Sequence, residues 1–186
     1  SNIISYVDAV QLKNEHMVKL PVIVYNRDSQ AEVLTDAIDL RNKLEEIADA
    51  EYAKTGKYIR PIALFQAQPK GKEDATTFEK LRDKLVDAGI PAEQIAIRTA
   101  DVNELKNIDL MSPDCPIRYI ITVNALKEGW DCPFAYILAS LANKTSQVDV
   151  EQILGRILRL PHTSQHTQSA LNMSYVLTSS NDFNNT

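Results

Sequence analysis

The chain has 186 residues, which is enough for one α/β domain with a sizeable core and too few for two comfortable domains. Its hydrophobic content of 44% and charged content of 24% are ordinary for a globular protein, and no apolar run approaches the roughly 20 residues of a membrane-spanning helix. The net charge of −5 argues against a protein that binds nucleic acid by itself. A domain that holds only one side of a nucleic-acid strand need not be basic.

The chain starts at Ser1-Asn2, without an initiator methionine or a signal peptide. This start resembles the remnant of a cleaved purification tag, so we expect the sequence to be part of a longer protein. Cys115 and Cys132 have no nearby histidine or cysteine to complete a zinc pattern. Two reduced thiols in a cytoplasmic protein are therefore expected.

Short apolar runs alternate with longer amphipathic segments along the chain. Strands are predicted at residues 21–25, 62–65, 95–97, 117–123, 134–139 and 173–177, and helices at 29–54, 77–88 and 148–160. The first helix has capping candidates at Asp28 and Ser29 and a stop signal at Gly56. Continuous apolar strands are typical of a sheet covered on both faces, so residues 1–186 predict one α/β domain with a largely parallel sheet of about six strands flanked by helices. The polar segment 161–172 predicts an exposed loop.

The helix predicted at 148–160 contains the first group of candidate functional residues. At 100° per residue, Gln152, Arg156 and Arg159 fall on one face of this helix, and the intervening apolar residues fall on the other. Gly155 removes a side chain beside Arg156, where a ligand or partner must approach closely. Two guanidinium groups one turn apart can stabilise the charge that develops on a transferred γ-phosphoryl group. The same pattern also fits an amphipathic helix whose arginines are simply solvated.

The loop after the strand predicted at 117–123 contains the second group, Gly129 and Asp131. At the carboxyl end of a parallel strand, a glycine and an aspartate can offer backbone amides and a carboxylate to a ligand. Such a carboxylate can accept hydrogen bonds from ribose hydroxyls. The alternative is an ordinary turn, for which Gly129 and Pro133 are suitable residues.

In this order and at this spacing, the two groups resemble the last motifs of superfamily 2 helicases, a Gly-x-Asp loop followed by Gln-x-x-Gly-Arg-x-x-Arg. The strand at 62–66 is similar to the motif that opens the second domain of these proteins. The sequence Glu-Gly-Trp-Asp-Cys-Pro, followed by Gly-Arg-Ile-Leu-Arg-Leu-Pro, is most similar to the motor subunit of type III restriction enzymes. The resemblance covers about residues 10–178.

The resemblance implies a three-layer RecA-like fold and the role of a second motor domain in an ATP-dependent DNA helicase or translocase. It carries over Gln152, Arg156 and Arg159 as catalytic residues, and Gly129, Asp131 and Gly155 as nucleotide-binding residues. ATP and Mg²⁺ would be held mainly by the N-terminal motor domain of the same parent chain. Double-stranded DNA and a methyltransferase subunit would be further partners, in the cytoplasm and away from membranes. The alternative is a non-catalytic nucleotide-binding or protein-interaction module with a degenerate motor fold, against which the two arginines argue.

The motifs that bind the phosphates of ATP are absent from the sequence. None of the five glycines belongs to a Gly-x-x-x-x-Gly-Lys-Ser/Thr loop, and no Asp-Glu pair follows a strand to hold magnesium. We therefore expect no ATP hydrolysis by this chain alone.

Four further features have ordinary structural interpretations. Pro113-Asp114 lacks the second half of a nuclease motif and is typical of a turn. The three histidines, His16, His162 and His166, lack a third ligand, so no metal site is predicted. Lys70-Gly71-Lys72 is more typical of a solvated turn than of a contact with a nucleic-acid backbone. Trp130 can stack on a base or pack beneath its own loop.

Overall fold

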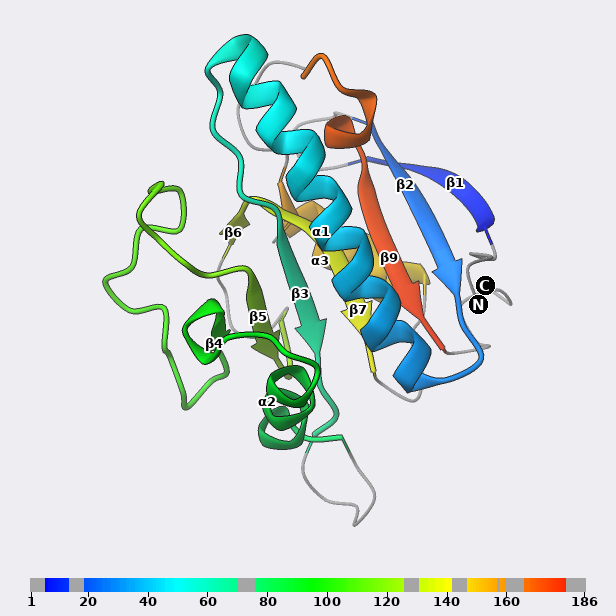
Figure 1. Cartoon of the computed structure of the whole chain (residues 1–186). Helices are drawn as coiled ribbons and strands as arrows, with labels where there is room; N and C mark the ends of the chain where they lie inside the picture. Colours follow the sequence, from blue (N-terminus) through cyan, green and yellow to red (C-terminus); the bar gives the residue numbers. More distant parts are fainter. Residues whose placement is uncertain are drawn as a thin grey trace.

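The centre of the molecule is a seven-stranded sheet in the order β1-β2-β9-β7-β3-β5-β4 (Figure 1). The computed structural model describes residues 6–13, 19–69, 76–125, 131–141, 147–156, 158–159 and 166–179; for 6–13, 19–21, 147–149, 156 and 158–159 it describes the backbone. Within these ranges six strands of the sheet are parallel, and the edge strand β1 runs antiparallel to β2. This confirms the expected three-layer, largely parallel RecA-like α/β fold.

The elements follow the predicted order, with two additions. The strands of the main sheet are β1 (Tyr6–Lys13), β2 (Lys19–Asn26), β3 (Ile62–Gln66), β4 (Ile95–Ile97), β5 (Tyr119–Thr122), β7 (Ala135–Ser140) and β9 (Ser174–Thr178). The helices are α1 (Gln30–Thr55), α2 (Phe78–Asp87) and α3 (Gln147–Arg156), with short 3-10 turns η1 (Ala92–Gln94) and η2 (Ser169–Asn172). A separate pair of short strands joins β6 (Cys132–Pro133) to β8 (Leu158–Arg159). The sequence prediction includes neither β1 nor this pair.

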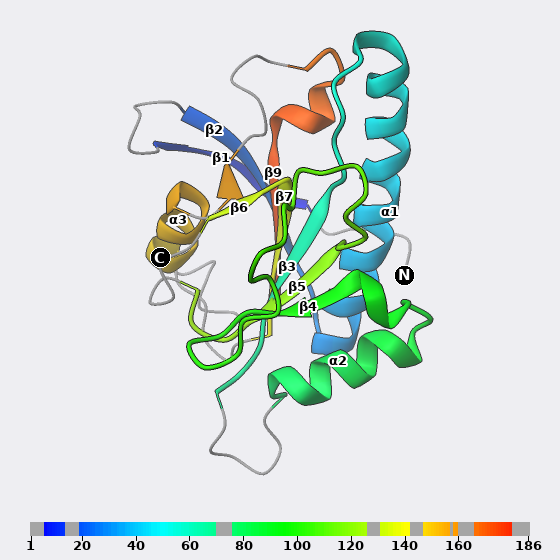
Figure 2. The same ribbon diagram turned by 90° about the vertical axis from the view of Figure 1, so that its left-hand side faces the viewer.

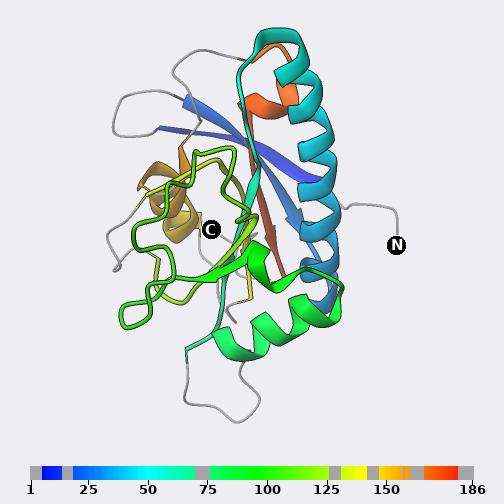
Figure 3. The same ribbon diagram turned by 60° about the vertical axis from the view of Figure 1, so that its left-hand side comes forward.

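The helices cover the sheet from both sides. Helices α1 and α2 lie on one face, and α3 lies on the opposite face beside β6 and β8 (Figure 2). The long connection from β4 to β5, residues 98–118, runs beside the β4–β5 edge of the sheet (Figure 3). Within the described ranges no helix has the combined length and apolarity needed to cross a membrane.

Local capping signals set the ends of the two helices on the first face. The Ser29 hydroxyl accepts a hydrogen bond from the Glu32 N–H at the start of α1. Gly56 ends this helix in a left-handed conformation with a φ of 77°, which glycine adopts without a Cβ clash. The Thr77 hydroxyl caps α2 by accepting from the Lys80 N–H. These caps confirm both predicted helices.

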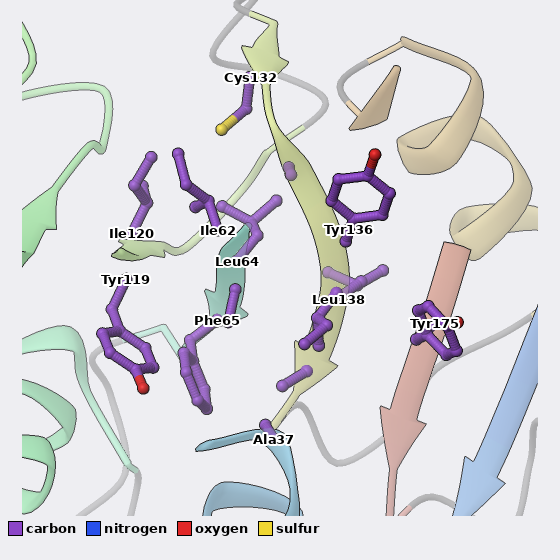
Figure 4. Packing of buried hydrophobic residues seen from close by; sticks show 14 of the residues in the cluster. Ala37, Ile62, Leu64, Phe65, Tyr119, Ile120, Cys132, Tyr136, Leu138 and Tyr175 are labelled. Atoms are coloured by element: carbon purple, nitrogen blue, oxygen red, sulfur yellow. The ribbon is translucent and has the colours of Figure 1, made fainter. Parts of the chain in front are cut away.

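The core lies between the central strands and the helices. Side chains of β3, β5 and β7 fill it, among them Ile62, Leu64, Phe65, Tyr119, Ile120 and Leu138, all of them buried (Figure 4). Burying such a side chain contributes about 1.5–3 kcal/mol relative to leaving it in water. The continuous apolar strands recognised in the sequence are therefore the middle layer, as expected.

The segment after residue 165 is fastened to the end of α1 by a buried carboxylate. Glu51 accepts hydrogen bonds from the Thr167 hydroxyl at 2.7 Å and from the backbone N–H groups of Thr167 and Gln168 at 3.1 and 3.0 Å. His166 Nδ1 lies 4.0 Å from a Glu51 oxygen, and both side chains are buried. The expected exposed loop at 161–172 therefore differs from the structure over its described part, 166–172, where His166 and Leu171 are buried.

These contacts predict a specific pH dependence of stability. The Thr167 hydroxyl above all, with the two backbone donors and His166, holds the pKa of Glu51 below the ordinary value of 4.5, against the opposing effect of burial. A carboxylate whose pKa is lower in the folded than in the unfolded chain stabilises the fold at every pH above its unfolded pKa. This stabilisation is lost as the pH falls below 4.5 and through the folded pKa of Glu51. Chemical denaturation across this window should show a smaller acid-dependent loss of stability for Glu51→Gln than for wild type, together with lower stability at pH 7.

The matched control is Glu46→Gln, on the exposed side of the same helix. We expect it to change the free energy of unfolding by no more than about 0.5 kcal/mol. Parallel pH profiles for wild type and Glu51→Gln would contradict the proposed contribution of this buried carboxylate.

Candidate functional site

The two candidate motifs meet at the edge of the domain where the parallel strands begin. Strands β6 and β8 pair in parallel, with Cys132 opposite Leu158 and Pro133 opposite Arg159. The residue before this pair is Asp131, which is exposed. The pairing therefore brings the chain that follows Asp131 beside the backbone of Leu158 and Arg159, although a strand and a helix separate them in the sequence.

The predicted helix at 148–160 is too long, and this changes the relation between the two arginines. Helix α3 ends at Arg156, and Arg159 lies in β8. The sequence Ile-Leu-Arg-Leu has good helix propensity, but the backbone of Leu158 and Arg159 pairs with β6 instead. The expectation that Gln152, Arg156 and Arg159 share one helical face is therefore wrong for Arg159.

The position expected for Asp131 also needs correction. The sequence argument puts it at the carboxyl end of the strand now identified as β5. Because β5 and β7 are parallel, the connection between them must return to the edge where both strands begin. Asp131 follows that return, lies just before β6, and is at the opposite edge from the end of β5 at Thr122 (Figure 1).

Helix α3 has the amphipathic character expected from its sequence over its described part. Val150, Ile153 and Leu154 are buried, whereas Gln152 is exposed. For Arg156 and Arg159 the description covers the backbone. Gly129, Trp130 and Ile157 lie outside the described residues, as do Lys70-Gly71-Lys72, His16 and His162.

Among the described residues, buried apolar side chains and the buried Arg60 guanidinium lie close to this edge. Cys132 is fully buried next to exposed Asp131, and burial above all, with a contribution from the Asp131 charge, raises the pKa of its thiol. The nearby Arg60 guanidinium opposes this rise. Both cysteines are free and buried, and Cys132 is suited to packing rather than to nucleophilic chemistry.

Arg60 is a structural residue that the sequence argument misses. Its Nε donates to the Ile117 carbonyl at 2.7 Å, and its Nη1 donates to the Ser112 carbonyl at 3.0 Å. Its Nη2 donates to the Leu110 carbonyl. With 1% of its surface exposed, it links the start of β3 to the connection before β5. Its isolated position after an apolar residue and before Pro61 gives no local signal of this role.

Gly155 is the site residue whose surroundings are best defined. A Cβ added to it would meet no atom of the described residues within 4 Å, and its φ is not in the left-handed region. Packing against the part of the chain that the structure describes therefore does not require glycine at this position. The observation is compatible with a close approach from outside the domain.

We predict that Gly155→Ala leaves the stability of this chain unchanged or raises it by up to about 1 kcal/mol, because alanine has the higher helix propensity. Urea unfolding measures the difference. Gly89→Ala is the control, because Gly89 has a φ of 98° and alanine there should destabilise the chain. A clear loss of stability in Gly155→Ala would mean that the glycine serves the fold.

A row of polar residues crosses the opposite edge of the sheet. The register aligns the last residues of five adjacent strands, which are Asn26, Thr178, Ser140, Gln66 and Thr122. Residues in one row point to the same face of the sheet. Tyr119 points to the α1 face, because its hydroxyl accepts a hydrogen bond from Arg41 of α1. Side chains alternate between the two faces along a strand, so Thr122, three positions later, points to the other face. The row therefore faces the α3 side. The sequence signal is a polar residue at the end of each apolar run, which the motif search does not use.

The remaining candidates have structural surroundings. His166 belongs to the Glu51 contacts described above. Asp114 is exposed, and its N–H donates to the Ser112 hydroxyl, as expected for a turn. Among the residues that the structure describes, no three His, Cys, Asp or Glu side chains are grouped to hold a metal ion.

Comparison with known proteins adds no family assignment. No protein-family model matches the chain, and a search of curated proteins finds no match. The motif residues and the β6–β8 pairing are therefore the features of this chain that bear on its function.

Proposed function

We propose that this chain is the second motor domain of an ATP-dependent superfamily 2 helicase or translocase, with the restriction subunit of a type III system as its parent. In this role Arg156 and Arg159 act on ATP held by the first motor domain of the parent. Gln152 and Asp131 contact the same nucleotide, and Gly155 allows its close approach. Mg²⁺ would be held by the first domain together with the phosphates.

The observation that carries the proposal is the pairing of β6 with β8 at the edge where the parallel strands begin. It groups exposed Asp131 with the backbone of Leu158 and Arg159. A carboxylate suits ribose hydroxyls, and guanidinium groups suit phosphate oxygens. A nucleotide that enters between two domains meets both kinds of group along its length.

The opposite edge is the proposed nucleic-acid surface. Ligands of parallel α/β sheets bind beyond the carboxyl ends of the strands. The polar row from Asn26 to Thr122 lies at this edge. Asn26 and Gln66 are partly exposed, Thr178, Ser140 and Thr122 are buried, and exposed Asn124 follows the row. Nucleic acid at one edge and ATP at the other allow domain closure around ATP to move a bound strand, here double-stranded DNA.

The competing function is a non-catalytic module that keeps the motor fold. Such a module, which would bind nucleotide without hydrolysing it or bind another protein, has no requirement for either arginine. The two functions differ in whether ATP turnover by the parent depends on these residues.

The test uses the full-length parent and measures DNA-stimulated ATP hydrolysis. Asp131→Ala is expected to raise the KM for ATP about fivefold, which corresponds to about 1 kcal/mol for a partly exposed hydrogen bond. Asp114→Ala, at an exposed aspartate of a turn, is the control and should leave KM unchanged. Equal KM values for wild type and Asp131→Ala would favour the non-catalytic module, whereas hydrolysis of ATP by this chain without the first domain would contradict both functions.

A further inference from the structure

The link between β6 and β7 contains an unusual backbone conformation. Phe134 has a φ of 72°, in the left-handed region that bulky L-residues rarely adopt. Glycine or asparagine is the usual residue for such a position. A buried phenylalanine persists there only when its surroundings determine its conformation strongly.

Contacts on several sides hold Phe134 in place. The Arg60 Cζ lies 5.8 Å from the centre of its ring, and the Tyr58 ring lies 5.9 Å away in an edge-to-face arrangement. Its carbonyl accepts a hydrogen bond from the Ile62 N–H at 2.8 Å. Its side chain is 1% exposed. Because Arg60 is itself fixed by three backbone carbonyls, the ring rests on a rigid support.

The conformation of Phe134 marks the place where the chain changes partners. Residues after Phe134 pair with β3, and the register shifts there, because Ile62 is opposite Ala135 but Ala63 is opposite Ile137. Residues before Phe134 pair with β8 instead. The left-handed turn therefore directs β6 out of the main sheet.

We infer that Phe134 is a positioning residue that holds β6 against β8 and so keeps Asp131 beside the Arg159 segment. Its consequence for ATP turnover rests on the proposed function. The buried ring fixes the point where the chain turns, and the left-handed backbone sets the direction of β6. Phe134 itself touches neither nucleotide nor phosphate in this role.

The first experiment uses this chain and needs no ATP. Hydrogen exchange is measured for the backbone amides of Cys132 in β6 and of Leu158 and Arg159 in β8, in Phe134→Leu and in Phe65→Leu. Phe65 is a matched control because its ring is also fully buried, and it packs against Tyr119 away from the β6–β8 pair. We expect exchange in β6 and β8 to accelerate at least tenfold more in Phe134→Leu than in Phe65→Leu. Where Phe134→Leu does not fold, Phe134→Met keeps more of the apolar volume and gives the same comparison.

The second experiment measures kcat and KM for magnesium-ATP in the full-length parent. Phe134→Leu should lower kcat at least tenfold, whereas Phe65→Leu should leave kcat within twofold of wild type even if it destabilises the domain equally. Equal exchange in the two variants would overturn the positioning role and leave the proposed function intact. Selective exchange with an unchanged kcat would instead overturn the proposed use of this edge in ATP turnover.

Discussion

Arg159→Lys and Arg156→Lys in the full-length parent are each expected to lower ATP turnover by roughly 10³- to 10⁵-fold, the range that arginine fingers contribute to phosphoryl transfer. Lysine keeps the positive charge but lacks the planar fork of donors that matches phosphate oxygens. For Arg159 the expectation has a geometric basis, because the backbone pairing with Pro133 fixes the position of the residue relative to β6. Steady-state kinetics give the turnover.

The control for this prediction is Arg82→Lys, at an arginine whose side chain is partly exposed and paired with Glu104. It should leave turnover unchanged. Melting temperatures of all three variants should stay close to that of wild type, because in the proposed role Arg156 and Arg159 serve the ATP of the partner domain and Arg82 belongs to a partly exposed ion pair, which contributes little stability. Near-normal turnover in both site variants would exclude the arginine-finger mechanism, and a large fall in melting temperature would assign a structural role to the residue concerned.

Arg60→Met is expected to have the largest effect on stability, lowering the free energy of unfolding by about 3–5 kcal/mol. Arg60 donates to the carbonyls of Ile117, Ser112 and Leu110. The Ser112 carbonyl also accepts from the Cys115 N–H at 3.0 Å, so the Ile117 and Leu110 carbonyls account for most of the loss, and each buried carbonyl left without a donor costs about 1–3 kcal/mol. Removal of the buried charge offsets part of that cost. Urea or guanidinium unfolding of this chain measures the difference.

Arg82→Met is the matched control for Arg60→Met, because it removes the same kind of side chain from a solvent-exposed ion pair. Its expected effect is below about 1 kcal/mol. Equal effects of the two substitutions would show that the carbonyl contacts of Arg60 contribute nothing special to the fold.

The sequence by itself determines the elements whose signals are local. Helix α1 begins and ends where Ser29 and Gly56 predict, because a side-chain cap and a left-handed glycine act on the adjacent backbone. The apolar strands β3, β5 and β7 could be recognised because a sheet buried on both faces needs continuous apolar runs. The two candidate motifs could also be recognised, since the residues of each motif lie close together in sequence.

Only the tertiary structure decided how those motifs meet. Arg159 lies outside the helix because the backbone of β8 pairs with β6. Local helix propensity cannot predict this pairing, because β7 and α3 separate the two strands in the sequence. Asp131 lies where the parallel strands begin because the connection from β5 must return before β7 can run in the same direction. Arg60 and Phe134 support this edge through contacts with residues distant in sequence, and hydrogen bonds and ring contacts of this kind arise only once the sheet has assembled.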